Sequence, residues 1–132
     1  MNVKTASALA ATALVSLTLG AASPASAAAP AADPAQLILT ASSQVDGSLR
    51  AVSLLCGPAG GTHPDAHAAC AALDAVDSDL DRLPVSERPC AQIYDPVRVT
   101  ATGTYAGRLV RWDKTYGNTC ELEQATGAVF RF

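Results

Sequence analysis

The sequence lacks the motifs on which common enzyme sites depend. Its only histidines, His63 and His67, lie four residues apart, without the glutamate of the His-Glu-x-x-His pattern of zinc metalloproteases. It also lacks the Gly-x-Ser-x-Gly turn of serine hydrolases and a phosphate-binding glycine loop. We therefore interpret both histidines as solvent-exposed residues near a helix start, and we expect no enzyme, no metal site and no cofactor.

Charge of one sign is not concentrated anywhere in the chain. Nine Lys and Arg residues stand against twelve Asp and Glu residues, and the formal net charge is −3. This distribution indicates neither a nucleic-acid partner nor a membrane partner.

The acidic run from Asp74 to Asp81 falls in a predicted helix, where its carboxylates would point to different faces rather than into a calcium-binding loop. We interpret it as a solvent-exposed face.

The one long apolar run, from Ala6 to Leu19, is shorter than the roughly 20 residues that a membrane-spanning helix needs. Lys4 precedes it, and the small-residue triplet Ala25-Ser26-Ala27 follows it. This arrangement is typical of a secretory signal peptide that is removed before Ala28. We therefore predict a signal peptide at residues 1–27 and a secreted, extracellular protein.

The remaining chain is long enough for a single domain with one modest core. Residues 28–36 are rich in Ala and Pro and show no apolar periodicity, which predicts a flexible N-terminal tail. Residues 37–132 then form the one folded domain.

All four cysteines lie in this exported part, where an oxidising compartment favours disulfides. Because they form no Cys-x-x-Cys pair, two disulfides are favoured over a zinc site. Three pairings are possible, and proximity favours Cys56 with Cys70 and Cys90 with Cys120. Each would close a loop that stabilises the fold by about 3 to 4 kcal/mol in the chain-entropy model.

Local patterns predict a β-hairpin followed by one long helix. The short β-type runs Leu37–Ser42 and Leu49–Cys56 are separated by the turn signal Asp46-Gly47. Apolar residues then recur at helical spacing over 66–83, with Thr62 as the predicted cap and Pro84 as the end of the helix.

A second pair of strands is predicted over Val97–Thr102 and Leu109–Tyr116, and a last strand over Ala128–Phe132. Strands that follow one another on both sides of a single long helix are typical of an α+β domain with an antiparallel sheet.

The segment from Val85 to Asp95 differs in kind from the rest of the chain. Pro89 and Pro96 restrict its backbone, and Cys90 ties it covalently, so we expect a stiff, extended loop. Gln92, Ile93 and Tyr94 lie between these anchors and are large enough to fill the subsites of a protease. An ordinary disulfide-linked connection between two elements, with Ile93 and Tyr94 turned into the core, explains the sequence of this segment equally well.

Several strings of the chain, in this order, resemble the Streptomyces subtilisin inhibitor family, and the resemblance covers nearly all of residues 37–132. They are Gly61-Thr62-His63-Pro64, Ala69-Cys70-Ala71-Ala72-Leu73, Cys90-x-x-Ile93-Tyr94-Asp95-Pro96-Val97, Cys120-Glu121 and Val129-Phe130-Arg131-Phe132. The resemblance implies a five-stranded antiparallel sheet with two helices, the same two disulfides that proximity favours, and a homodimer packed through the sheet.

The same resemblance implies a function and a site. The expected activity is inhibition of an extracellular subtilisin-like serine protease, with Gln92-Ile93 as the reactive bond and Gln92 in the specificity pocket of the enzyme. The residues expected to contact the protease around that bond are Pro89, Cys90, Ala91, Tyr94 and Asp95. An uncharged Gln92 suits a broad subtilisin pocket and not trypsin, whose pocket carboxylate requires Lys or Arg. The family often has Met or Lys at the position of Gln92, and Pro at that of Ala91, so both departures bear on the target and the affinity.

Two other functions fit the same loop. A thermolysin-like metalloprotease takes a hydrophobic residue just after the scissile bond, which Ile93 would supply. A transglutaminase could use an exposed Gln92 as acyl donor. Inhibition assays with a panel of proteases would distinguish a metalloprotease inhibitor from a subtilisin inhibitor. Amine incorporation at Gln92 without protease inhibition would identify a transglutaminase substrate.

Overall fold

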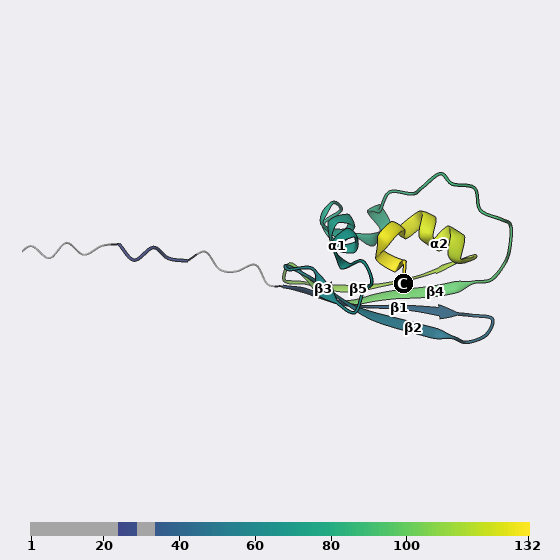
Figure 1. Ribbon diagram of the computed structural model, residues 1–132, viewed down its shortest axis with the longest axis horizontal. Coiled ribbons are helices and arrows are strands. Elements are labelled where there is room, and N and C mark those ends of the chain that lie inside the picture. The colour runs from purple at the N-terminus through teal and green to yellow at the C-terminus, as the bar shows by residue number, and fades with distance from the viewer. Residues whose placement is uncertain (1–23, 29–33) are drawn as a thin grey trace, which may run out of the picture.

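The computed structural model describes residues 24–28 and 34–132. Most of the predicted signal peptide at residues 1–27, and part of the predicted tail at residues 28–36, therefore lie outside the described residues. The folded part consists of one antiparallel sheet with two helices on one of its faces (Figure 1). This arrangement confirms the predicted α+β class. The elements in chain order are β1 Ala35–Ser43, β2 Leu49–Cys56, β3 Gly60–Gly61, α1 Ala66–Asp74, the 3-10 helix η1 Leu80–Arg82, β4 Val97–Tyr105, β5 Arg108–Tyr116, α2 Thr119–Thr126 and the 3-10 helix η2 Gly127–Phe130.

The sheet has the strand order β3-β2-β1-β4-β5, with β1 at its centre. Leu39 on β1 lies opposite Val52 on β2 and opposite Ala101 on β4. Side chains on β1 alternate between buried and exposed, as a strand with one covered face requires. Both predicted hairpins, β1–β2 and β4–β5, are confirmed. β1 begins at Ala35, so Ala35 and Gln36 belong to the sheet and not to the predicted tail at 28–36.

The long helix predicted over 66–83 is wrong in its second half. Helix α1 ends at Asp74, because Asp77 and Ser78 have φ values of 53° and 60°, which a right-handed helix cannot contain. The chain turns there and continues as η1. The apolar spacing misled the prediction because the turn still buries Val76, Leu80 and Leu83 in the same core. The cap is also a different residue: Asp65, rather than Thr62, accepts the N–H of Ala68 at 3.2 Å.

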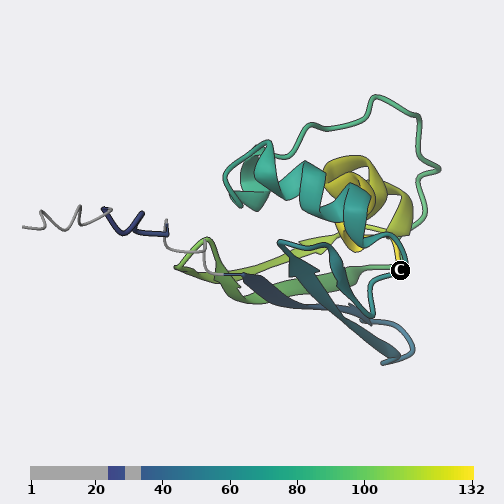
Figure 2. The ribbon, with the colours of Figure 1, turned by 60° about the vertical axis from the view of Figure 1, so that its left-hand side comes forward.

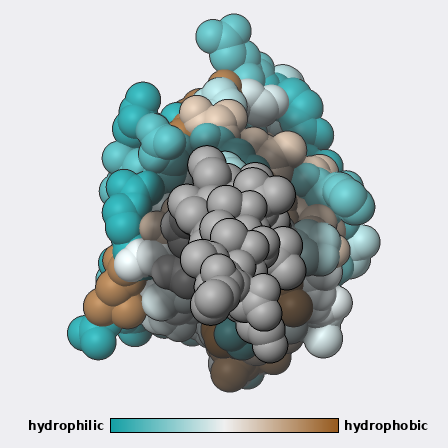
Figure 3. Space-filling view, turned by 90° about the vertical axis from the view of Figure 1, so that its left-hand side faces the viewer, coloured by the Kyte–Doolittle hydropathy of each residue, from teal (hydrophilic) through white to brown (hydrophobic). Residues whose placement is uncertain are grey.

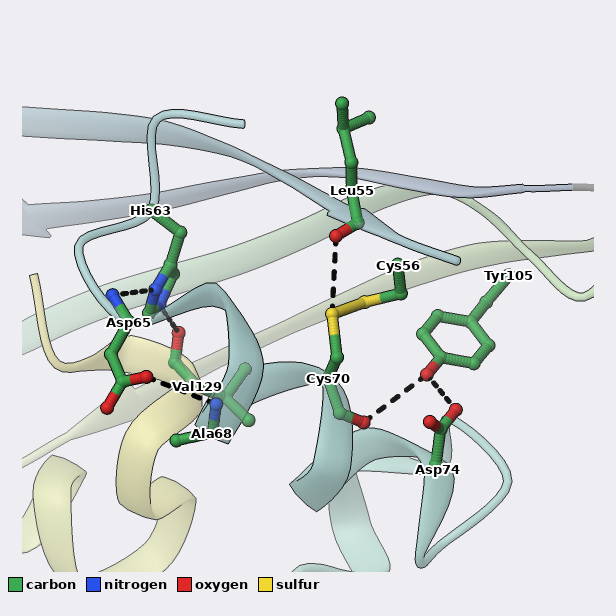
Figure 4. The surroundings of a disulfide bond; sticks show 9 residues. All are labelled: Leu55, Cys56, His63, Asp65, Ala68, Cys70, Asp74, Tyr105 and Val129. Atoms are coloured by element: carbon green, nitrogen blue, oxygen red, sulfur yellow. Dashed lines mark hydrogen bonds between the residues drawn. A yellow bond between two sulfur atoms is a disulfide. The ribbon is translucent and has the colours of Figure 1, made fainter. Parts of the chain in front are cut away.

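The prediction that both histidines are solvent-exposed is wrong for His63. Only 6% of His63 is exposed. Its Nδ1 accepts the backbone N–H of Asp65 at 3.0 Å, so its Nε2 carries the hydrogen and donates to the carbonyl of Val129 at 3.1 Å (Figure 4). His63 thereby joins the start of α1 to the C-terminal residues. His67 is exposed, as predicted.

The strand predicted over Ala128–Phe132 is wrong as well. The chain forms helix α2 and then η2, and Gly127, the first residue of η2, has a φ of 55°, which favours glycine. Val129 and Phe130 of η2 are buried in the core, and the ring of Phe130 lies 5.7 Å from that of Trp112 on β5. The fifth strand of the sheet is instead the two-residue β3. In Figure 2, α1 and α2 overlap in the view, and both lie above the sheet.

The disulfide between Cys56 and Cys70 joins β2 to α1, with a Cα–Cα distance of 5.7 Å (Figure 4). Beside it, the hydroxyl of Tyr105 donates a hydrogen bond to the carboxylate of Asp74. Burial, and then the Asp74 carboxylate, raise the pKa of Tyr105 above its usual value. The phenol therefore stays protonated in the folded protein over the ordinary pH range. Both disulfide pairings favoured by proximity are present.

Candidate functional site

The segment from Val85 to Asp95 forms a loop without regular secondary structure between η1 and β4. It arches outward beside α2 (Figure 1). The side chains at its far side point into solvent, with 64% of Ile93 and 83% of Tyr94 exposed. Gln92 is exposed too. The alternative in which Ile93 and Tyr94 turn into the core is therefore wrong.

The first half of the loop is tied to α2 by covalent and hydrogen bonds. The disulfide between Cys90 and Cys120 places their Cα atoms 5.8 Å apart. Nearer the start of the loop, the N–H of Ser86 donates to the carbonyl of Gln124 at 2.8 Å. An ion pair of 3.9 Å between Arg88 and Glu123 is largely exposed and contributes little by itself. The disulfide is thus the main restraint just before Gln92.

Asn118 holds the loop on both sides of Gln92. Its side-chain Nδ2 lies 2.9 Å from the carbonyl oxygen of Ile93 and 3.5 Å from that of Ala91. Its Oδ1 accepts the backbone N–H of Glu121 at 2.9 Å, which makes Asn118 the N-cap of α2. Asn118 is 7% exposed, so these bonds form largely out of water. They become stronger and more directional as a result.

The backbone after Gln92 is fixed at two further points. The N–H of Asp95 donates to the carbonyl of Gly117 at 2.9 Å, and the N–H of Gln44 donates to the carbonyl of Pro96 at 2.8 Å. Pro96 itself is buried. The loop therefore returns to the sheet through hydrogen bonds to Gly117, two residues before α2, and to Gln44 in the β1–β2 turn.

A tight turn surrounds Gln92. The N–H of Ile93 donates to the carbonyl of Ala91 at 2.9 Å, a three-residue turn with Gln92 at its apex. Among the described residues, the Gln92 side chain makes no hydrogen bond. It is exposed, while Asn118 approaches the backbone carbonyls of Ala91 and Ile93 on either side of it.

The structure brings together the loop residues singled out in the sequence, but sequence analysis missed the residue beneath them. Asn118 lies three positions before Glu121, and this Asn-x-x-Glu spacing is the signature of a helix start with a capping box. That signal could have located α2. It could not have indicated that Nδ2 of the cap reaches a loop 25 residues away in the chain.

The two histidines do not form a common site, since one is buried and the other exposed. Within residues 24–28 and 34–132, no group of three or more His, Cys, Asp and Glu side chains is arranged to hold a metal ion. Over the same residues, no helix is both long and apolar enough to span a membrane.

Comparison with known proteins identifies the family. Residues 33–118 match the family described as Subtilisin inhibitor-like. The chain belongs to this family. Subtilisin inhibitor-like protein 5 of Streptomyces fradiae is 50% identical over 86 residues, which are 64% of this chain and 80% of that protein. Trypsin inhibitor STI2 of Streptomyces longisporus is 41% identical over 133 residues, or 95% of this chain and 92% of that protein.

A solved structure supports the same conclusion for the fold. Streptomyces caespitosus sermetstatin, crystallised in complex with Bacillus licheniformis subtilisin, superposes with a TM-score of 0.63 at 37% identity, covering 75% of this chain and 99% of sermetstatin. The subtilisin inhibitor-like family is one of protease inhibitors. In this family member, Asn118 and the Cys90–Cys120 disulfide hold a loop whose outer side chains, Ile93 and Tyr94, are exposed.

Proposed function

We propose that this protein is an inhibitor, not an enzyme, and that it blocks extracellular subtilisin-like serine proteases by presenting Gln92-Ile93 as the bond to be cut. One observation carries the proposal: Gln92 is exposed at the apex of a loop whose flanking carbonyls, of Ala91 and Ile93, are both approached by Asn118. The complex of sermetstatin with subtilisin supports the choice of enzyme class.

Tight binding follows from the rigidity of the loop. A protease binds its substrate as an extended strand, and a flexible peptide loses conformational entropy when it adopts that shape. Here the disulfide to Cys120 and the hydrogen bonds of Asn118 restrict the backbone before the enzyme arrives. Only the three-residue turn at Gln92 has to open to give an extended strand. Little further ordering is needed, so recognition of a substrate-like segment becomes inhibition.

Slow and reversible cleavage follows from the same restraints. After attack on the Gln92 carbonyl, the acyl-enzyme would carry Gln92 and the new amine would belong to Ile93. Cys90 remains joined to Cys120 by the disulfide on one side of the cleaved bond. The carbonyl of Ile93 remains hydrogen-bonded to Asn118 on the other side. The amine therefore stays beside the acyl group, and the peptide bond reforms more often than water completes hydrolysis.

The side chain of Gln92 supports subtilisin over trypsin as the target. It is uncharged and of medium size, which a broad pocket accepts, whereas the trypsin pocket places a carboxylate where Lys or Arg should bind. The residues proposed to lie against the enzyme on either side are exposed or half-buried: Pro89, Cys90, Ala91, Ile93, Tyr94 and Asp95.

The proposal includes a homodimer that forms through the uncovered face of the sheet. This face carries the exposed apolar side chains of Ile38, Leu49 and Leu55, which are 42%, 66% and 38% exposed. In Figure 3, hydrophobic residues also lie along the lower edge of the molecule, the side of the sheet in Figure 1. A sedimentation-equilibrium mass of twice the chain mass supports the dimer, and a mass of one chain contradicts it.

Secretion is part of the same proposal. The apolar run after Lys4 favours export, and the two disulfides are stable in the oxidising environment outside the cell. Recovery of the protein from the medium of an expressing bacterium, with an N-terminus near Ala28, is the expected result.

The inhibitory activity is tested by titration of a purified subtilisin with the protein. Residual activity should fall linearly to near zero at one inhibitor chain per enzyme. Parallel titrations of a thermolysin-like metalloprotease and of trypsin define the specificity. Full activity of subtilisin at a tenfold excess of the protein would refute the proposal.

A further inference from the structure

The first turn of α2 contains a carboxylate, that of Glu121, that none of the proposed contacts with the protease uses. Oε2 of Glu121 accepts the backbone N–H of Gly117 at 3.0 Å. In the usual capping box, the acidic residue of the first helical turn reaches the N–H of the cap residue itself. Here the carboxylate reaches one residue further back, past Asn118, to Gly117.

Both backbone polar groups of Gly117 are therefore in use. Its N–H donates to Glu121, and its carbonyl accepts the N–H of Asp95, the third residue after Gln92, at 2.9 Å. Gly117 is thus the link between the first turn of α2 and the part of the loop that follows the reactive bond.

The absence of a side chain at position 117 is needed for this contact. A Cβ built on Gly117 would lie 2.7 Å from Oε2 of Glu121 and 3.3 Å from its Cδ. Any other residue would therefore push the carboxylate off the Gly117 N–H. The backbone of Gly117 is not in the left-handed region, so glycine is not needed there for its conformational freedom.

We propose that Glu121 is a positioning residue of the reactive loop: it holds Gly117 and Asn118 in the arrangement that restrains Ile93 and Asp95. The inference rests on the proposed function at Gln92-Ile93. The backbone N–H of position 121, which any residue there would supply, separately donates to Oδ1 of Asn118 at 2.9 Å. The Glu121 carboxylate acts on the adjacent Gly117, and through it on the hydrogen bond that holds Asp95.

Amide hydrogen exchange followed by NMR tests this role without a protease. In Glu121→Ala, the Asp95 amide should exchange about fivefold faster than in the parent, the factor expected for weakening of one hydrogen bond. Glu121→Gln keeps an oxygen that can accept the Gly117 N–H, so it should exchange at nearly the parent rate. Asp65→Ala is the matched control, because it removes the side-chain cap of the other helix, α1.

A second variant perturbs the same contact from the opposite side. Gly117→Ala leaves Glu121 in place but displaces its carboxylate. It should speed exchange at Asp95 by about the same factor as Glu121→Ala, and the double variant should show no further increase, since both changes break one interaction. This non-additivity would not arise from a general loss of stability.

The inhibition assay adds the functional readout. Glu121→Ala should raise the inhibition constant for subtilisin about fivefold and speed hydrolysis of the reactive bond by a similar factor, and Glu121→Gln should restore both. If Asp95 exchange, inhibition and hydrolysis change no more in Glu121→Ala than in Asp65→Ala, the inference is overturned. If the parent does not inhibit subtilisin at all, the proposed function fails, while the exchange data still decide whether Glu121 positions the loop.

Discussion

The side-chain amide of Asn118 donates a hydrogen bond of 2.9 Å to the carbonyl oxygen of Ile93. Its oxygen accepts the N–H of Glu121 from the first turn of α2. The two bonds fix the orientation of the amide, since only the nitrogen can donate and only the oxygen can accept. The position of the loop and the start of the helix are therefore coupled through one side chain.

Substitution of Asn118 by Asp should separate these two roles. Asp caps a helix about as well as Asn, so the free energy of unfolding should change by less than about 1 kcal/mol. It cannot donate to the carbonyl of Ile93, however, and places a negative charge beside it. The inhibition constant for subtilisin should rise about 10- to 100-fold.

Thermal unfolding and enzyme titration of Asn118→Asp, with Asn118→Ala as the variant that loses both roles, check this prediction. An inhibition constant for Asn118→Asp equal to that of the parent would show that the hydrogen bond to Ile93 does not support the loop.

The two disulfides should differ in function although they contribute similarly to stability. Their sequence separations of 14 and 30 residues correspond to about 3 and about 4 kcal/mol in the chain-entropy model. Only Cys90–Cys120 ties the loop that is proposed to carry the reactive bond. Replacement of this pair by Ser should turn the protein into a substrate that is cut after Gln92, whereas replacement of Cys56 and Cys70 should leave a folded fraction that still inhibits.

Residual subtilisin activity after long incubation, at a temperature where circular dichroism shows both variants folded, separates the two outcomes. Equal inhibition by the parent and by the variant without Cys90–Cys120 would argue against restraint of the loop as the source of inhibition.

Specificity should follow the side chain at position 92. Gln92→Lys should gain trypsin inhibition through an ion pair in the trypsin pocket and keep much of its activity on subtilisin. Gln92→Leu should tighten binding to subtilisin by about 1 to 2 kcal/mol, because apolar burial replaces an amide that the pocket does not satisfy. Gln92→Pro should abolish inhibition, since the proline ring restricts the backbone that the enzyme must bind. Inhibition constants against both enzymes that are the same for all three variants would assign the specificity to other residues.

Stability at alkaline pH should depend on Tyr105. Burial and the Asp74 carboxylate raise its pKa in the folded state, so its contribution is complete below the pKa of about 10 of an unfolded tyrosine. The contribution is lost as the pH rises above 10, because the unfolded chain can then release the proton and the folded protein resists doing so. Tyr105→Phe should cost about 1 kcal/mol at pH 7 and flatten the loss of stability above pH 10.

Urea denaturation of the parent and of Tyr105→Phe between pH 7 and 11 measures this difference. Tyr116, whose pKa burial also raises, leaves a residual alkaline slope in both proteins. Parallel curves for the two proteins over the whole range would contradict the assigned role of Tyr105.

The parts of the fold that depend on local signals could be predicted from the sequence. The turn signal at Asp46-Gly47 between two short β-type runs identified the first hairpin, and cysteine proximity favoured the correct disulfides. The helix was extended too far because apolar spacing does not reveal where a chain turns while it continues to cover the same core. The chain turns at Asp77 and Ser78 through positive φ values, and no local sequence pattern marks these two residues as a turn.

The site was only half predictable for a related reason. Prolines and a cysteine around Gln92 mark a restrained loop within one stretch of sequence. The contact of Asn118 with that loop depends on how α2 packs beside it, and His63 is buried because it meets the carbonyl of Val129, 66 residues away. Such partners are determined by tertiary packing, which no local pattern contains.

Mass spectrometry of the inhibitor after prolonged incubation with subtilisin identifies the bond that the enzyme cuts. We expect one slow cleavage, between Gln92 and Ile93, with the two fragments still joined through the Cys90–Cys120 disulfide and with inhibition largely retained. A first cut at any other bond, or rapid cleavage at Gln92-Ile93 with loss of inhibition, would contradict it.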